Sequence, residues 1–287
     1  MSKLIVKLAE FSARVFPTSV KRMIYRIKPL ASLIRGELNR AVPDGLTIAT
    51  IAAGDLAGSP MYLDLQSEKD YWLGTYEPEL QIAIQEFVKP GMVVFDVGAN
   101  IGYITLLLAD VVGANGHVFA FEALPNNVKR LKENITVNNF DNRVTMISAA
   151  VADRSEKMRF LVGPSGGMGK LEGSAGRDEV DYPEFIEVPS VCLDDFVFTK
   201  KQSLPDVIKF DIEGGEILAL KGMQRILTHA QPLILMEIHG PEAARSAWNT
   251  LSSSGYLICQ MKPGYPQVHD VDDLDWKAYI VGLPRNE

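Results

Sequence analysis

Apolar strand-like segments alternate with amphipathic helix-like segments along most of the chain after residue 90. The predicted strands lie at 92–97, 117–121, 144–151, 207–212, 232–239, 256–261 and 278–283. The predicted helices, where apolar side chains recur with helical spacing, lie at 103–112, 126–138, 216–227 and 241–253. Repeated β-α-β units of this kind predict an α/β fold, with a mostly parallel sheet covered by helices on both faces.

The start of the chain has a different character, that of a basic helical extension. Residues 1–40 show helical apolar spacing divided by Pro17 and Pro29, and they carry a net charge of +7 in a chain whose total is −7. A basic amphipathic helix can lie on an anionic membrane surface, and packing on the core or on a partner subunit is the alternative that we favour. The acidic remainder of the chain argues against nucleic acid as a substrate.

Between this extension and the alternating region, the pattern predicts two short strands and one helix. The strands are expected at 46–51 and 61–65, and Pro78 suits the first position of the helix. We therefore expect a helical extension over 1–45 and one main domain over 46–287. Within that domain, residues 70–90 form a leading helix region.

An insertion at 152–205 interrupts the alternation. Runs at 158–162 and 185–191 predict a hairpin. The loop 163–184 inside it is rich in glycine, namely Gly163, Gly166, Gly167, Gly169, Gly173 and Gly176. Such a loop is expected to be either a lid over the site or a segment without regular structure.

The cysteines and the overall hydropathy predict a cytoplasmic protein with reduced thiols. Cys192 and Cys259 lie far apart, each in a strand-like run, which does not suggest a disulfide framework. No window approaches the roughly 20 apolar residues that a membrane span needs.

The segment Asp96–Tyr103, with the sequence DVGANIGY, carries the most specific chemical signal. It follows an apolar strand and opens a helix, which is where open α/β sheets bind their ligands. Glycines here allow the backbone to approach a ligand closely, and asparagine tolerates a positive φ better than most residues. The predicted cofactor loop consists of Asp96, Gly98, Asn100, Gly102 and Tyr103, and simple packing is equally open for the tyrosine.

Glu122 ends the next predicted strand, where a carboxylate can accept hydrogen bonds from both ribose hydroxyls of a bound nucleoside. A nicotinamide cofactor would use the same place, but its G-x-G-x-x-G pattern is absent because Asn100 and Tyr103 replace two of the glycines. The glycine spacing therefore favours S-adenosylmethionine over NAD. An NAD-dependent oxidoreductase and a non-catalytic binding protein with the same fold are the alternative functions.

Motifs in a fixed order resemble those of the FkbM family of methyltransferases. They are GTYEP at 74–78, DVGANIGY at 96–103, AFEA at 120–123, LDDF at 193–196, IKFDIEG at 208–214 and MEIH at 236–239. The family commonly has proline directly after the acid of the second strand, whereas this chain has Ala123 and places Pro125 two positions later. Little of the resemblance extends to residues 1–40 or to the glycine-rich loop.

This resemblance implies a Rossmann-like methyltransferase fold with a seven-stranded sheet and S-adenosylmethionine as the methyl donor. It also implies methylation of a hydroxyl group on a saccharide, a glycolipid or a small natural product. Glu77, beside a predicted helix start, is then expected to meet the methionine ammonium of the cofactor; stabilisation of the helix dipole is the alternative. Ala150, near the end of the third strand, completes the predicted cofactor set.

Charged residues gather where the strand at 207–212 ends. Lys209, Asp211 and Glu213 alternate in sequence, so we expect their side chains to share one face of a regular strand. Asp211 is predicted to contact the cofactor or the acceptor. Lys209 either acts catalytically or forms an ion pair with an acid, because a buried charge is costly unless it is paired.

Glu237 and His239 repeat this arrangement on the following strand. Histidine titrates near neutrality, so we hypothesise that His239 is the general base for the acceptor hydroxyl, oriented by Asp211 or Glu237. Capping of the following helix is the alternative role for the histidine. The predicted catalytic residues are therefore His239, Asp211, Glu237 and Lys209.

The same region offers ligands for a metal ion. Asp211, Glu213, Glu237 and His239 supply oxygen and nitrogen atoms of a kind that holds Mg²⁺ or Mn²⁺. We treat a site without metal as the main interpretation and a metal site as the alternative.

Overall fold

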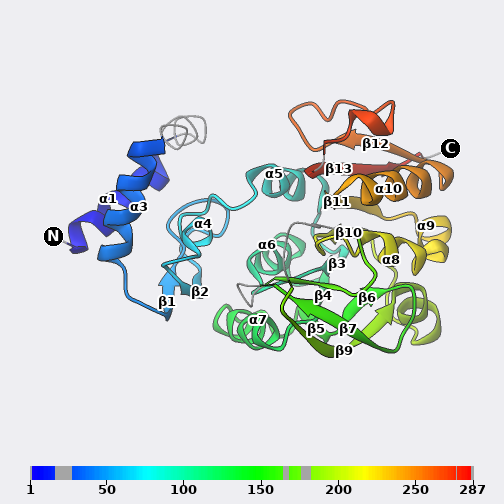
Figure 1. Cartoon of the computed structure of the whole chain (residues 1–287), viewed down its shortest axis with the longest axis horizontal. Coiled ribbons are helices and arrows are strands. Elements are labelled where there is room, and N and C mark those ends of the chain that lie inside the picture. The colour runs from blue at the N-terminus through cyan, green and yellow to red at the C-terminus, as the bar shows by residue number, and fades with distance from the viewer. Residues whose placement is uncertain (1, 17–27, 164–167, 176–181, 276, 286–287) are drawn as a thin grey trace. The chain divides into compact units, whose positions relative to one another are not determined.

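The computed structural model describes residues 2–16, 28–163, 168–175, 182–275 and 277–285. The chain forms two compact units, which Figure 1 shows together. The first comprises Met1–Pro78 with Thr136–Asn139, and the second comprises Glu79–Ile135 and Phe140–Glu287. The division falls after Pro78 instead of at residue 45, because the two strands that follow the extension form a sheet of their own.

Helices and a two-stranded sheet make up the first unit. Its elements are α1 (Ser2–Val15), α3 (Lys28–Ala41), β1 (Leu46–Thr50), β2 (Pro60–Asp64) and α4 (Lys69–Trp72). Pro17 lies outside the described residues, and Pro29 lies in the first turn of α3, where proline is tolerated.

The extension is amphipathic in the structure too. Leu8, Phe11 and Val15, which follow helical spacing on α1, are all exposed. Among the residues that the structure describes, no helix is both long enough and apolar enough to cross a membrane. Contact of the extension with a membrane surface stays a prediction.

A seven-stranded sheet forms the centre of the second unit, as the alternating pattern predicts. Its strands are β3 (Val93–Val97), β4 (His117–Glu122), β5 (Val144–Ser148), β10 (Val207–Phe210), β11 (Leu233–His239), β12 (Tyr256–Gln260) and β13 (Lys277–Pro284). Their order is β12-β13-β11-β10-β3-β4-β5, and only β13 runs antiparallel to its neighbours. The chain therefore starts in the middle of the sheet and winds outward in both directions, which is the Rossmann-like arrangement.

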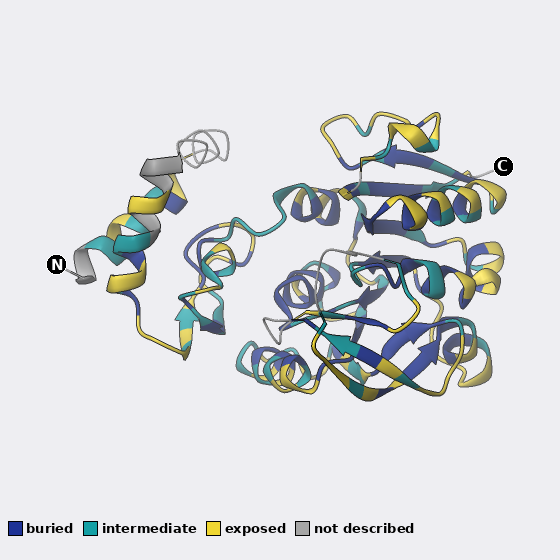
Figure 2. Ribbon diagram, viewed as in Figure 1, coloured by how far each residue is buried: buried dark blue, intermediate teal, exposed yellow. Residues whose placement is uncertain are grey.

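Helices cover both faces of this sheet. They are α5 (Pro78–Phe87), α6 (Tyr103–Val112), α7 (Pro125–Val137), α8 (Glu216–Lys221), α9 (Gln224–His229) and α10 (Pro241–Ser253). Figure 1 shows α6 and α7 on one side of the strands and α8, α9 and α10 on the other. The chain moves from β3 toward one edge of the sheet and from β10 toward the other edge. Because each crossover is right-handed, the helices of the two halves lie on opposite faces. The four central strands, β3, β4, β10 and β11, are almost wholly buried (Figure 2).

A second, four-stranded sheet fills the insertion. Its strands are β6 (Ala150–Ala152), β7 (Lys157–Val162), β8 (Gly169–Leu171) and β9 (Glu184–Cys192). β7 and β9 form the predicted antiparallel hairpin. The prediction of one strand over 144–151 is wrong, because the segment divides at Ala149: β5 pairs with β4, whereas β6 pairs with β9.

The glycine-rich loop is only partly within the described residues. Its segment Gly169–Leu171 forms β8 and pairs with β7, so this part of the loop has regular structure. Residues 164–167 and 176–181 lie outside the described part, and the lid function stays a prediction. Two short helical turns, η1 (Asp195–Thr199) and η2 (Val271–Asp273), complete the unit.

The helix predicted over 216–227 is instead two helices, α8 and α9, because the chain bends at Gly222. A Cβ atom at this position would lie 2.2 Å from the carbonyl oxygen of Ala152. The Gly222 carbonyl accepts hydrogen bonds from the N–H of Asp194 at 2.8 Å and from the Sγ of Cys192 at 3.1 Å. Cys192 and Cys259 are both free and buried.

Candidate active site

The loop between β3 and α6 folds back onto its own sheet. Gly98, Asn100 and Gly102 have φ angles of 85°, 50° and 99°, so all three adopt the conformation that the residue types suggest. The N–H groups of Gly98 and Ala99 both donate to the carbonyl of Phe121, at 3.0 and 2.9 Å. These two bonds hold the loop against the end of β4.

Contacts within the protein explain why glycine is needed at two loop positions. A Cβ atom at Gly98 would lie 1.9 Å from the carbonyl oxygen of Asp211, and one at Gly102 would lie 2.7 Å from Cδ1 of Leu131. The sequence interpretation attributed both glycines to the close approach of a ligand. The structure supplies a further reason, because atoms of Asp211, directly after β10, and of Leu131 in α7 approach these positions, and the approach of a ligand stays a prediction.

A buried ion pair lies directly beneath the loop. The Nζ of Lys209 lies 3.1 Å from Oδ1 of Asp96 and donates to the carbonyl of Gly98 at 3.0 Å. Thr105 donates from its hydroxyl to Oδ2 of Asp96 at 2.6 Å, and both charged side chains are almost completely buried. This is the ion pair that the sequence left as the alternative for Lys209. We infer that Asp96 and Lys209 position the loop, and their direct contact with ligands stays a prediction.

Glu122 lies where the sequence predicts, at the end of β4 next to the loop. Its Oε2 accepts a hydrogen bond from the N–H of Asn100 at 2.8 Å, and its Oε1 accepts one from the N–H of Leu124 at 2.8 Å. Burial raises the pKa of Glu122, while these backbone donors oppose the shift. Each carboxylate oxygen can accept more than one hydrogen bond, so the anchored carboxylate can still receive ligand hydroxyls.

For the other three predicted cofactor residues, the structure gives the position in the fold. Tyr103 is buried at the start of α6, and Ala150 is buried at the start of β6. Glu77 belongs to the first unit and has a positive φ of 41°. Contact of these three residues with a cofactor stays a prediction.

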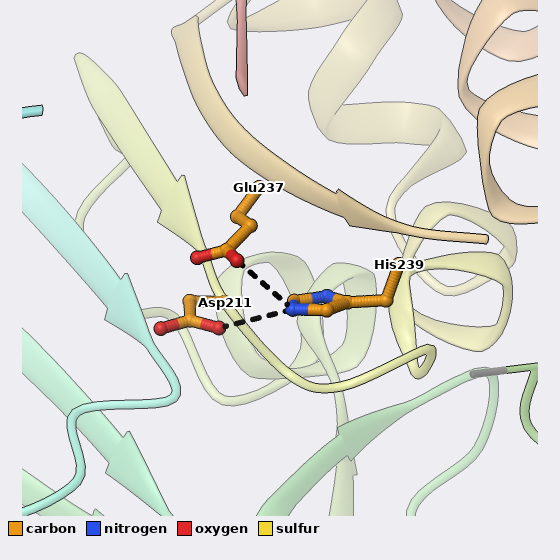
Figure 3. Close-up of side chains that lie close together, drawn as sticks. All are labelled: Asp211, Glu237 and His239. Carbon is orange, nitrogen blue, oxygen red and sulfur yellow. Dashed lines mark ion pairs between the residues drawn. The ribbon is translucent and has the colours of Figure 1, made fainter. Parts of the chain in front are cut away.

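A second group of polar side chains lies where β10 and β11 end, and its centre is the fully buried imidazole of His239. Its Nδ1 lies 3.0 Å from Oε1 of Glu216. On the other side of the ring, Nε2 lies 3.2 Å from Glu237 and 3.8 Å from both Asp211 and Glu213. Figure 3 shows the carboxylates of Asp211 and Glu237 directed at this nitrogen. We call these five residues the His239 cluster.

Burial and neighbouring charges move the pKa values in this cluster. Burial lowers the pKa of His239, but the carboxylates of Glu216 and Glu237 beside its two ring nitrogens outweigh burial and raise this pKa to about 10. Burial also works against ionisation of Glu237, yet His239 and Lys277 lower its pKa to about 2. Burial raises the pKa of Asp211 to about 6. The imidazole is thus protonated at neutral pH, whereas a general base must be neutral, so this geometry does not favour the general-base hypothesis for His239.

The His239 cluster forms without the regular strand that the sequence predicted. The prediction of a strand over 207–212 is wrong at its end, because β10 stops at Phe210 and Glu213 adopts a positive φ of 51°. Lys209 consequently bonds beneath the loop, whereas Asp211 and Glu213 turn to His239.

Sequence reasoning missed two members of this neighbourhood. Glu216 is fully buried at the start of α8, and its place three residues after Glu213 in sequence is only a weak signal. Lys277 pairs its ammonium with Glu237 from the antiparallel strand β13. No local pattern marks Lys277, because only the pairing of β13 with β11 brings it there.

Comparison with known proteins agrees with this geometry. Residues 96–274 match the methyltransferase FkbM domain. A hexuronic acid methyltransferase, AglP from Haloferax volcanii, is 24% identical over 70% of this chain and 79% of its own length. The 31-O-demethyl-FK506 methyltransferase FkbM from Streptomyces tacrolimicus is 25% identical over 71% of this chain and 82% of its own.

One solved structure is also similar to this chain. It is a methyltransferase FkbM from Methylobacillus flagellatus, 20% identical, with a TM-score of 0.44. The match covers 74% of this chain and about half, 52%, of that protein. The match to the domain itself extends over more than half of the chain and includes both the glycine loop and the His239 cluster. The chain therefore belongs to the FkbM family of methyltransferases.

Proposed function

We propose that this methyltransferase transfers a methyl group from S-adenosylmethionine to a hydroxyl group of a saccharide, a glycolipid or a small natural product. Family membership supports the transfer of a methyl group. Two relatives support the class of acceptor, since one is named for a hexuronic acid and the other for a 31-O-demethyl compound.

The observation that carries the proposal is the anchored carboxylate of Glu122 beside the loop of positive-φ residues. The N–H of Asn100 fixes one carboxylate oxygen and the N–H of Leu124 fixes the other. A carboxylate held at this point of a Rossmann-like sheet suits the vicinal hydroxyls of a ribose. S-adenosylmethionine supplies that ribose together with an electrophilic methyl group on its sulfonium.

The His239 cluster provides the acceptor side of the site. It stands at the ends of β10 and β11, and Asp211 touches the glycine loop through its backbone at Gly98. The cofactor loop and the cluster are therefore contiguous. Asp211 and Glu213 keep about a fifth of their side chains exposed, so their oxygens can meet an acceptor hydroxyl. Such contacts orient the hydroxyl for attack on the methyl group.

Two measurements test the function. Calorimetric titration with S-adenosylhomocysteine and, separately, with NAD should give heat with the first ligand alone. A screen of hydroxylated acceptors with radiolabelled S-adenosylmethionine should then identify the acceptor class by incorporation of label. Heat with NAD in place of S-adenosylhomocysteine would indicate the oxidoreductase alternative. Cofactor binding without labelling of any acceptor would favour a non-catalytic binding protein.

Replacement of Glu122 by glutamine should weaken binding of S-adenosylhomocysteine by about 10–100-fold. The amide keeps the size of the side chain but removes the negative charge and one acceptor oxygen from the ribose site. The dissociation constant measured by calorimetry checks this expectation. Glu187→Gln, at an exposed position of β9, is the matched control and should bind as the wild type does. An unchanged affinity in a folded E122Q variant would remove Glu122 from the site.

A further inference from the structure

The ligand-like atoms of the His239 cluster have the spacing of a metal coordination sphere. One atom from each of Asp211, Glu237 and His239 lies within 4.8 Å of the others. The Nε2 of His239 is 3.2 Å from Oε1 of Glu237 and 3.8 Å from Oδ1 of Asp211. Ligands about 2.1 Å from an octahedral ion are about 3 Å apart when adjacent and about 4.2 Å apart when opposite. The two distances from Nε2 of His239 fall within this range.

The orientation of the histidine is also that of a metal ligand. A metal-bound histidine normally donates its other ring N–H to a carboxylate, which fixes the ring and its tautomer. Glu216 accepts from Nδ1 at 3.0 Å, and both side chains are fully buried. Nε2 is therefore directed at the carboxylates, where it is buried and makes no hydrogen bond. Oε1 of Glu237 lies 3.2 Å from this nitrogen and is also the oxygen that pairs with Lys277.

The charges around this point leave room for a cation. Carboxylates of Asp211, Glu213, Glu216 and Glu237 all lie within 4 Å of the imidazole ring nitrogens. Lys277 pairs with Glu237, and the nearby Lys209 is held by Asp96 and the Gly98 carbonyl. Buried carboxylates are costly unless cations offset them.

We propose that Asp211, Glu237 and His239 bind one divalent cation, which replaces the proton on Nε2 of His239, with Glu216 supporting the histidine. A set of one imidazole and two carboxylates suits a first-row transition cation such as Mn²⁺ better than it suits Ca²⁺, which takes oxygen ligands. The sequence interpretation preferred a site without metal, and the buried, unbonded Nε2 is the observation that reverses this preference.

The catalytic consequence rests on the proposed function. A cation at this position would coordinate the acceptor hydroxyl and lower its pKa, so that its proton leaves to solvent or to a carboxylate. His239 would then serve as a ligand and not as the base, because Glu216 holds its Nδ1 and the cation would occupy its Nε2.

The test is a titration of the full-length protein with Mn²⁺ after removal of metals by a chelator, without S-adenosylmethionine. Electron paramagnetic resonance of free Mn²⁺ gives the number of bound ions and their affinity. We expect one ion per chain. Glu237→Gln and Asp211→Asn should each weaken binding at least tenfold, and Glu216→Gln should weaken it by about 10–100-fold through the histidine. Glu187→Gln should leave binding unchanged.

The outcomes separate this proposal from the proposed function. The metal site would be overturned if neither Mn²⁺ nor Zn²⁺, the latter in a parallel calorimetric titration, bound stoichiometrically. Equal binding of Mn²⁺ by the wild type, D211N and E237Q would also overturn it. S-adenosylhomocysteine binds at the other side of the site and is titrated into the same metal-free protein. Binding of S-adenosylhomocysteine without Mn²⁺ binding rejects only the metal. Mn²⁺ binding without S-adenosylhomocysteine binding rejects only the cofactor. Circular dichroism shows whether each variant folds, and the partly exposed Asp211 provides the variant least expected to unfold.

Discussion

Replacement of Lys209 by methionine should destabilise the protein by about 3–5 kcal/mol, the usual cost of removing one partner of a buried ion pair. Methionine fills a similar volume but leaves the carboxylate of Asp96 charged, and that side chain is completely buried. The change also removes the hydrogen bond to the Gly98 carbonyl. Thermal unfolding followed by circular dichroism should therefore show a midpoint lowered by roughly 10 °C.

A double variant separates the ion pair from simple packing. Adding Asp96→Asn to Lys209→Met neutralises the uncompensated charge and retains an acceptor for Thr105, so the double variant should be more stable than K209M alone. If the thermal unfolding midpoint of K209M equals that of the wild type, the ion pair contributes little to stability. If the double variant also binds S-adenosylhomocysteine more tightly than K209M does, this recovery would support the role of Lys209 in positioning the loop.

Replacement of Gly98 by alanine should cost about 3 kcal/mol or more, because two effects add. The residue has a φ of 85°, and a side chain in such a conformation costs of order 1–3 kcal/mol. In addition, the new Cβ would meet the Asp211 carbonyl oxygen at 1.9 Å, so the ends of β3 and β10 must separate. We expect a lower unfolding midpoint and loss of S-adenosylhomocysteine binding in calorimetry.

Gly255→Ala is the matched control for this variant. Gly255 has a similar φ of 82°, but no atom lies within 4 Å of its added Cβ. It should therefore suffer only the backbone strain, of order 1–3 kcal/mol, and keep its affinity for S-adenosylhomocysteine. Equal destabilisation of the two variants would show that the contact with Asp211 is unimportant. The difference between them measures the contact that joins the cofactor loop to the His239 cluster.

The prediction of the site from sequence succeeded where the signal was local. Asn100 was singled out for its tolerance of a positive φ, and it has one, because this preference belongs to the residue itself. Glu122 was placed at the end of its strand by the apolar run before it, and the strand does end there. The partners of Lys209 could not be predicted, because Asp96 lies on a neighbouring strand more than a hundred residues earlier.

The sequence alone determined the architecture of the second unit and the position of each chemical motif along it. Hydrophobic periodicity reports which faces are buried, and alternating strand and helix periods leave few arrangements other than a doubly wound sheet. The sheet order and the parallel strands agree with this expectation.

The tertiary structure alone decided which charged residues meet. β10 ends at Phe210, so Asp211 and Glu213 leave the line of Lys209 and approach His239. The start of α8 adds Glu216, and the register of β13 on β11 adds Lys277. Burial and Coulomb interactions act between groups that are close in space, whatever their separation along the chain. A periodic pattern records only the burial of each residue, and for this reason the His239 cluster became recognisable only in the folded protein.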